Sequence, residues 1–121
     1  MLTYKQCSEL EFYTLLKDIH VEYHIEQCYQ IFVHGHQILR IWRDGSYSLY
    51  DGGIRSTLVK KKLNDYGPVQ IIQKKGRWYW CIDKKIQGVF LNGMRVNKRG
   101  TLCYKEKGKL FLTLNIQKLE V

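Results

Sequence analysis

Short apolar runs separated by turn residues set what this chain can fold into. Asp44-Gly45 and Asn92-Gly93 are two-residue turn signals, and each lies between runs rich in β-branched and aromatic residues. "HGH" at 34–36 and "KKG" at 74–76 interrupt the chain in the same way. The pattern predicts an antiparallel sheet built from serial β-hairpins.

Successive strands are expected over Cys28 to Val33, Gln37 to Trp42 and Ser46 to Tyr50. Further hairpins are expected over residues 69–82, 88–96 and 101–121. Because side chains alternate along a strand, Ile38 is expected to share a face with Arg40 and Trp42. Leu39, Ile41 and Arg43 are expected on the other face.

Two helices are predicted beside these strands. The apolar spacing of residues 8–20 suits a helix over one face of the sheet, with Ser8 and Glu11 as a capping box. A second helix is expected to begin at Ser56 or Thr57 and to end at Gly67, before Pro68. Its expected buried stripe is Leu58, Val59, Leu63 and Tyr66. The whole prediction is one α+β domain over residues 1–121, with seven or more short strands and two helices.

The charge is concentrated in the second half of the chain. The net charge is +9, of which residues 1–50 contribute −2 and residues 51–121 contribute +11. This imbalance favours polyanionic partners, namely DNA, RNA or an acidic protein surface. The alternative is a basic, soluble surface with no dedicated ligand. No apolar run approaches the roughly 20 residues of a membrane span, so a cytoplasmic protein without membrane contact is expected.

Few residues suggest catalysis or metal binding. The four cysteines are widely spaced, which does not indicate a zinc site, and buried thiols are expected. The histidines lack a supporting metal motif, and the aspartates lie singly near predicted turns or helix ends. We therefore expect no cofactor and no metal, and the sequence favours a protein that is not an enzyme.

The stretch "SLYDGGIRSTLVKKKLNDYG", residues 48–67, suggests a phosphate site. Gly52 and Gly53 would let an anion approach the start of the second helix, where backbone N–H groups are unpaired. The candidate phosphate contacts are Arg55, Ser56, Thr57, Lys60, Lys61, Lys74, Lys75 and Arg77. The alternative is that Ser56 or Thr57 only caps the helix and that the lysines face water.

Aromatic residues lie among the basic ones in the predicted strands. Tyr50 and Trp78 are candidates for stacking on nucleic-acid bases. Because Trp78 and Trp80 share one face of their strand, the alternative is that both belong to the core.

The segment from His34 to Val96 resembles a group of small phage and bacterial mobile-element proteins. Their shared pattern is matched by Gly52, Gly53, Ile54, Arg55, Ser56, Thr57, Lys60, Leu63 and Asn64, followed by Gly76, Trp78 and Tyr79. Leu58 and Val59 stand where that group more often has hydroxyl residues. The resemblance implies a mobile-element origin and brings no activity with it. "GVFLNGMRVNKRGTLCYKEKGKLFL" is also similar to the hairpin of S4-type RNA-binding modules and of forkhead-associated domains, which implies a hairpin around Asn92-Gly93.

The sequence thus predicts a small basic nucleic-acid-binding module for DNA or RNA. The alternative is a mobile-element accessory protein that binds an acidic protein partner or self-assembles into a homo-oligomer through sheet edges.

Overall fold

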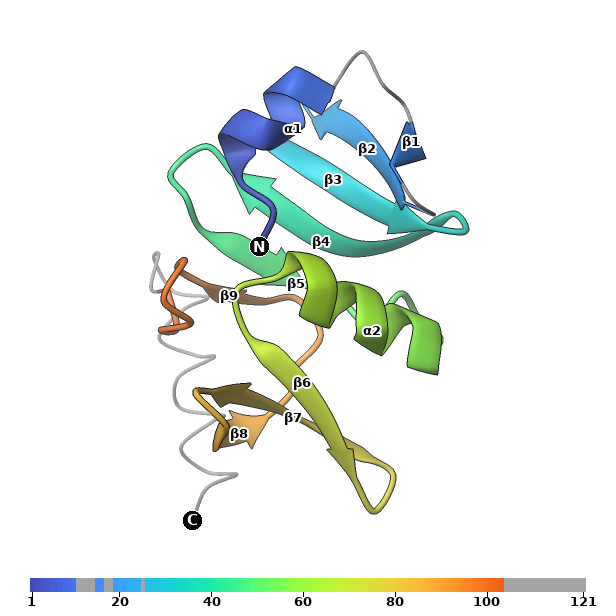
Figure 1. Ribbon diagram of the computed structural model, residues 1–121, viewed down its shortest axis with the longest axis vertical. Helices are drawn as coiled ribbons and strands as arrows, with labels where there is room; N and C mark the ends of the chain where they lie inside the picture. The colour runs from blue at the N-terminus through green and yellow to red at the C-terminus, as the bar shows by residue number, and fades with distance from the viewer. Residues whose placement is uncertain (11–14, 17–18, 25, 104–121) are drawn as a thin grey trace.

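The computed structural model describes residues 1–10, 15–16, 19–24 and 26–103, and it has the predicted α+β class. Two antiparallel sheets and two helices make up the fold (Figure 1). The larger sheet has the order β1 (Leu15–Leu16), β2 (Ile19–His24), β3 (Cys28–Val33), β4 (His36–Trp42), β5 (Tyr47–Leu49), β9 (Met94–Val96). The smaller sheet has the order β6 (Gln70–Lys74), β7 (Arg77–Ile82), β8 (Lys85–Val89). The helices are α1 (Tyr4–Leu10) and α2 (Thr57–Tyr66). The prediction of seven or more strands and two helices is confirmed, whereas the hairpin predicted beyond residue 103 lies outside the described residues.

The three successive strands predicted from the turn signals are present as β3, β4 and β5. Their serial antiparallel pairing is confirmed, with Gln30 opposite Arg40 and Arg40 opposite Ser48. Strict alternation fails at Ile38, because the register of β3 and β4 shifts between Ile31 and Phe32. Ile38 and Leu39 are consequently both fully buried, so Ile38 does not share the half-buried environment of Arg40.

The first predicted helix is placed wrongly. Helix α1 ends at Leu10, and residues 19–24 form β2, in which Ile19 and Val21 are buried with the period of a strand. Ser8 lies inside α1, where its hydroxyl donates to the carbonyl of Lys5 at 2.7 Å, so it does not cap the helix. The capping box is at Thr3 and Gln6, whose side chains each accept from the other's backbone N–H.

The Asn92-Gly93 turn does not close the predicted hairpin. Strand β8 before it pairs with β7, whereas β9 after it pairs with β5 of the larger sheet. Gly93 N–H donates to the carbonyl of Leu49, and the side chain of Asn92 accepts from Asp51 N–H at 2.8 Å. These bonds fasten the turn to the end of β5, so it carries the chain from one sheet to the other.

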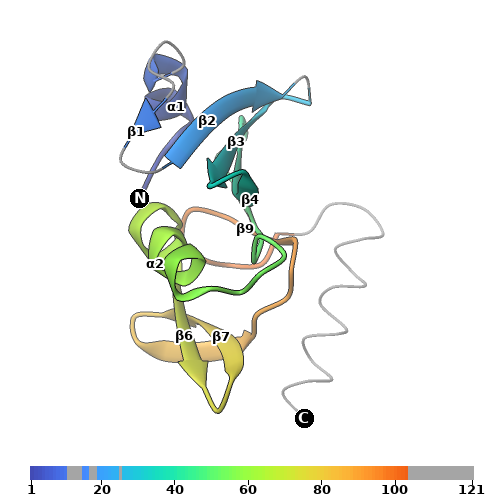
Figure 2. The ribbon, with the colours of Figure 1, turned by 90° about the vertical axis from the view of Figure 1, so that its right-hand side faces the viewer.

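Helix α2 lies between the sheets, as the two views show (Figures 1 and 2). Ser56 is its N-cap, and Gly67 N–H caps its end by donating to the carbonyl of Leu63. Val59 and Leu63 are buried as predicted, but Leu58 is 36% exposed and Lys62 is buried instead. The apolar stripe is therefore narrower than the sequence pattern predicts, because one flank of the helix faces solvent.

The side-chain amide of Asn64 fastens α2 to strand β6. Its oxygen accepts from Ile71 N–H at 2.6 Å, and its nitrogen donates to the carbonyl of Ile71 at 3.1 Å. The helix and the strand run in opposite directions, since Asn64 contacts Ile71 and the earlier residue Lys60 contacts the later residue Gln73. As a result, the first half of α2 faces the outer part of β6.

One hydrophobic cluster joins the parts of the described fold. It contains residues of both sheets and both helices, including Ile31, Val59 and Trp78. Near the N-terminus, Leu2 N–H donates to the carbonyl of Tyr66, and the Tyr47 hydroxyl donates to the carbonyl of Leu2. Neither of the helices described is long and apolar enough to cross a membrane.

Asn64→Ala tests the link between α2 and β6. The substitution removes both hydrogen bonds to Ile71, and we expect the free energy of unfolding to fall by about 2–3 kcal/mol in urea denaturation. Asp65→Ala, at an exposed position of the same helix, is the matched control and should change stability by less than about 0.5 kcal/mol. Equal effects of the two substitutions would contradict the anchoring role of Asn64.

Cys7 should make stability fall at alkaline pH. Burial raises the pKa of its thiol from 9.0 to about 12. In the unfolded chain the thiol ionises near pH 9, while in the folded protein it keeps its proton, so stability is full below pH 9 and decreases up to about pH 12. At one pH unit above the unfolded pKa the loss is about 1.4 kcal/mol.

The measurement is the free energy of unfolding at pH 8 and pH 10, for the parent protein and for Cys7→Ala. The variant should show a smaller decline between the two pH values, whatever its absolute stability. An unchanged decline would refute the assignment to Cys7. Burial raises the pKa of Cys28 and Cys81 as well, so Cys7→Ala should reduce the decline without abolishing it.

Candidate nucleic-acid interface

The glycine turn before α2 is closed around a carboxylate of the protein itself. Asp51 Oδ1 accepts from Gly53 N–H at 2.8 Å, and Oδ2 accepts from Arg55 Nε at 3.0 Å. The turn needs left-handed backbone at Gly52 and Gly53, with φ of 70° and 80°. An anion bound at this turn would meet the negative charge of Asp51. The donors of the predicted phosphate site, Gly53 N–H and Arg55 Nε, already bond this carboxylate.

Little space is left for a side chain at position 52, because strand β4 and helix α2 pack closely against Gly52. A Cβ atom at Gly52 would lie 3.2 Å from His36 Cβ and 3.4 Å from Val59 Cγ2. The close approach is thus to strand β4 and helix α2, and only Gly53 faces open space. The close approach at Gly52, which the sequence interpretation assigned to a ligand, is therefore to other parts of the fold.

The capping alternative is confirmed for Ser56. Its hydroxyl oxygen accepts from Val59 N–H at 3.1 Å, which satisfies one of the free donors at the start of α2. Thr57 is the first residue of the helix and is exposed.

Arg55 contacts buried residues of the fold and also contributes positive charge at the surface. Its guanidinium lies 5.5 Å from the ring centroids of both Trp78 and Phe90, which are buried and packed edge to face. The side chain is 41% exposed, so one side of the guanidinium still faces water. Arg55 thus links Asp51 to the core of the smaller sheet while adding positive charge at the start of α2.

The structure brings predicted cations of two segments, the first half of α2 and the β6–β7 hairpin, to neighbouring parts of the fold. Lys60 Nζ lies 3.4 Å from Oε1 of Gln73, which connects α2 to the outer part of β6. Lys74 and Arg77 face each other across the end of the hairpin, and Lys75 is in its turn. We call this surface the basic end; it consists of Arg55, Lys60, Lys74, Lys75 and Arg77. Lys61 is exposed but forms an ion pair with Asp65 at 3.2 Å, one helical turn away.

The predicted aromatic contacts are not arranged for stacking. Trp78 is 1% exposed and packs against Phe90, so a nucleic-acid base cannot reach its face. The core alternative therefore holds for Trp78, and Trp80 is buried as well. Tyr50 is half-buried, with the guanidinium of Arg40 5.8 Å from its ring centroid.

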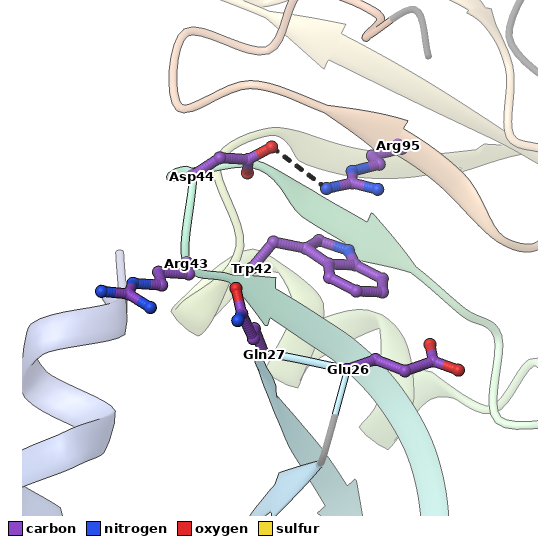
Figure 3. Close-up of a pocket in the computed structure, with 6 residues that line it drawn as sticks. All are labelled: Glu26, Gln27, Trp42, Arg43, Asp44 and Arg95. Carbon is purple, nitrogen blue, oxygen red and sulfur yellow. Dashed lines mark hydrogen bonds and ion pairs between the residues drawn. The ribbon is translucent and has the colours of Figure 1, made fainter. Parts of the chain in front are cut away.

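A second basic and aromatic group, which was not predicted from the sequence, lies on the larger sheet. The guanidinium of Arg95 lies 4.2 Å from the ring centroid of Trp42, whose Nε1 donates to Ser48 Oγ at 2.8 Å. Arg95 Nε also donates a hydrogen bond to Ser46 Oγ. Its guanidinium forms an ion pair with Asp44 (Figure 3). Arg40 and Trp42 were expected on one face, but nothing local in the sequence predicts that Arg95 of β9 joins them.

This group borders a pocket of about 200 Å³ whose charges balance. Arg43 and Arg95 line it together with Glu26 and Asp44 (Figure 3). An anion would be attracted and repelled by equal numbers of charges, so the pocket is a weaker candidate for nucleic acid than the basic end. In the described part of the chain, no group of three or more His, Cys, Asp or Glu residues is placed to hold a metal ion.

No protein-family model, curated protein or solved structure matches this chain.

Arg55→Ala should destabilise the fold. It removes the bond to Asp51 and the contacts with Trp78 and Phe90, and we expect a loss of about 1–2 kcal/mol in urea denaturation. Lys61→Ala removes an exposed cation of α2 and should cost less than about 0.5 kcal/mol. If both variants were equally stable, Arg55 would have no role in the fold.

Proposed function

We propose that this protein is a small nucleic-acid-binding module whose phosphate contacts come from the basic end. The observation that carries the proposal is the contact of Lys60 with Gln73, because it brings the cations of α2 and of the β6–β7 hairpin together. Residues 55–77 contain seven Lys or Arg residues and one acidic residue, Asp65. Such a local excess of positive charge attracts a phosphate backbone through the release of bound counterions.

The proposal differs from the sequence interpretation in where the phosphates bind. Lys74, Lys75 and Arg77 are exposed at the hairpin end and have no acidic neighbour in the local sequence. The glycine turn is not assigned a direct phosphate contact, since Asp51 already accepts hydrogen bonds from Gly53 N–H and Arg55 Nε. A mobile-element origin and a cytoplasmic location stay predictions.

The two hairpin turns of the smaller sheet offer a matched test. Lys74→Gln with Lys75→Gln removes two charges from the β6–β7 turn, and Lys84→Gln with Lys85→Gln removes two from the β7–β8 turn. Because β7 connects the two turns, they lie at opposite ends of the sheet. Fluorescence anisotropy with labelled DNA, over a salt series, measures the affinity of each variant.

Each phosphate contact contributes about 0.9 to the slope of log affinity against log salt concentration. The 74/75 variant should therefore show a slope smaller by about 1.8 and weaker binding at low salt, while the 84/85 variant should resemble the parent. Equal losses in the two variants would mean that binding follows net charge alone. Absence of binding to any nucleic acid at low salt would refute the proposal and leave an acidic protein partner as the alternative.

A further inference from the structure

The end of the β6–β7 hairpin is only two strands wide. Strand β8 pairs with β7 from Tyr79 to Ile82, and Phe90 N–H donates to the carbonyl of Trp78, so only the last pair, Lys74–Arg77, extends beyond the third strand. The turn of Lys75 and Gly76 is tight, with left-handed φ of 53° and 78°. In both views this turn lies at one extreme of the described part of the molecule (Figures 1 and 2).

We propose that this hairpin end enters the major groove of B-form duplex DNA, an inference that rests on the proposed function. The major groove is about 12 Å wide and 8.5 Å deep and admits a two-stranded ribbon, whereas the minor groove is only about 6 Å wide. Paired strands are about 4.8 Å apart, and each residue pair extends about 3.4 Å. The hairpin end, which consists of one residue pair and its turn, is thus narrow enough to enter the groove and reaches part of its depth.

The charges around the hairpin suit this placement. Lys74 and Arg77 flank the ribbon at its last pair, and both are exposed, as is Lys75 in the turn. Lys60 lies beside the ribbon through its contact with Gln73. Lys74 and Arg77 share one face of the ribbon because they are directly opposite each other, and with the ribbon in the groove these cations lie near the phosphates that border it, while Arg55 adds charge at the start of α2.

Single-stranded nucleic acid fits the basic end less well. Proteins that hold single strands stack the bases on exposed aromatic side chains. Here Trp78 is buried and Tyr79, the next residue of β7, is partly buried, while the large apolar side chains exposed near the basic end are Ile54 and Leu58, which are aliphatic. The exposed aromatic among the large apolar side chains of the described residues is Tyr23, on β2 of the other sheet.

Duplex RNA also fits less well, for a geometric reason. The major groove of A-form RNA is deep and narrow, so protein side chains do not reach its floor. A two-stranded ribbon would be excluded from it, and only contacts to the outer phosphates would remain. The proposal therefore distinguishes three ligands with the same phosphate chemistry.

The test compares four labelled probes with equal numbers of phosphates at one salt concentration. They are a DNA duplex, a single DNA strand, an RNA duplex of the same sequence, and the DNA duplex with glucosylated hydroxymethylcytosine, whose sugars fill the major groove. We expect the plain duplex to bind about tenfold or more tightly than each of the other three. The 74/75 variant should lose this preference, and the 84/85 variant should keep it.

The possible outcomes separate the two proposals. Equal or tighter binding of the single strand, the RNA duplex or the glucosylated duplex would overturn the groove inference. The proposed function would survive that result if the 74/75 variant still weakened binding and the 84/85 variant did not. No binding of any probe would overturn both.

Discussion

The pair of hydrogen bonds between Asn64 and the backbone of Ile71 sets the position of helix α2, and the basic end depends on it. The amide satisfies both a donor and an acceptor of β6, so only one rotation and one height of the helix are compatible with it. In that position Val59 and Leu63 enter the core and Lys60 reaches Gln73. A shift of one residue would rotate the helix by about 100° and separate the lysine from the hairpin.

Gly52, Arg55 and Ser56 belong to one connected structural unit before helix α2. Gly52 permits close packing on β4, Arg55 joins Asp51 to the rings of Trp78 and Phe90, and Ser56 caps α2. A pattern of Gly-Gly, Arg and Ser before a helix therefore has two physical explanations, a bound phosphate or an internal carboxylate. The sequence alone could not choose between them, because Asp51 becomes part of the site only through the shape of the turn.

The turn signals predicted β3, β4, β5 and β7 to within a residue at each end, because the residues that end these strands are local. Predictions that needed knowledge of distant partners failed. The Asn92-Gly93 turn was assigned to a hairpin, but its hydrogen bonds go to Leu49 and Asp51, far away in the sequence. For the same reason, the contact between Trp42 and Arg95 was missed. The cations of the basic end were all predicted, but their convergence follows from the antiparallel packing of α2 on β6.

The way the chain leaves and re-enters the larger sheet has a consequence for how the protein folds. Leu49 of β5 pairs with Met94 of β9, and this pairing closes a long loop of the chain. The loop contains helix α2 and the whole smaller sheet. Closing such a long loop is entropically costly when the intervening chain is unstructured. The smaller sheet is built from local hairpins, which form quickly and would bring β5 and β9, the two ends of the loop, closer together. The strand order therefore predicts that β9 is the last strand of the larger sheet to pair, after the smaller sheet and the basic end have formed.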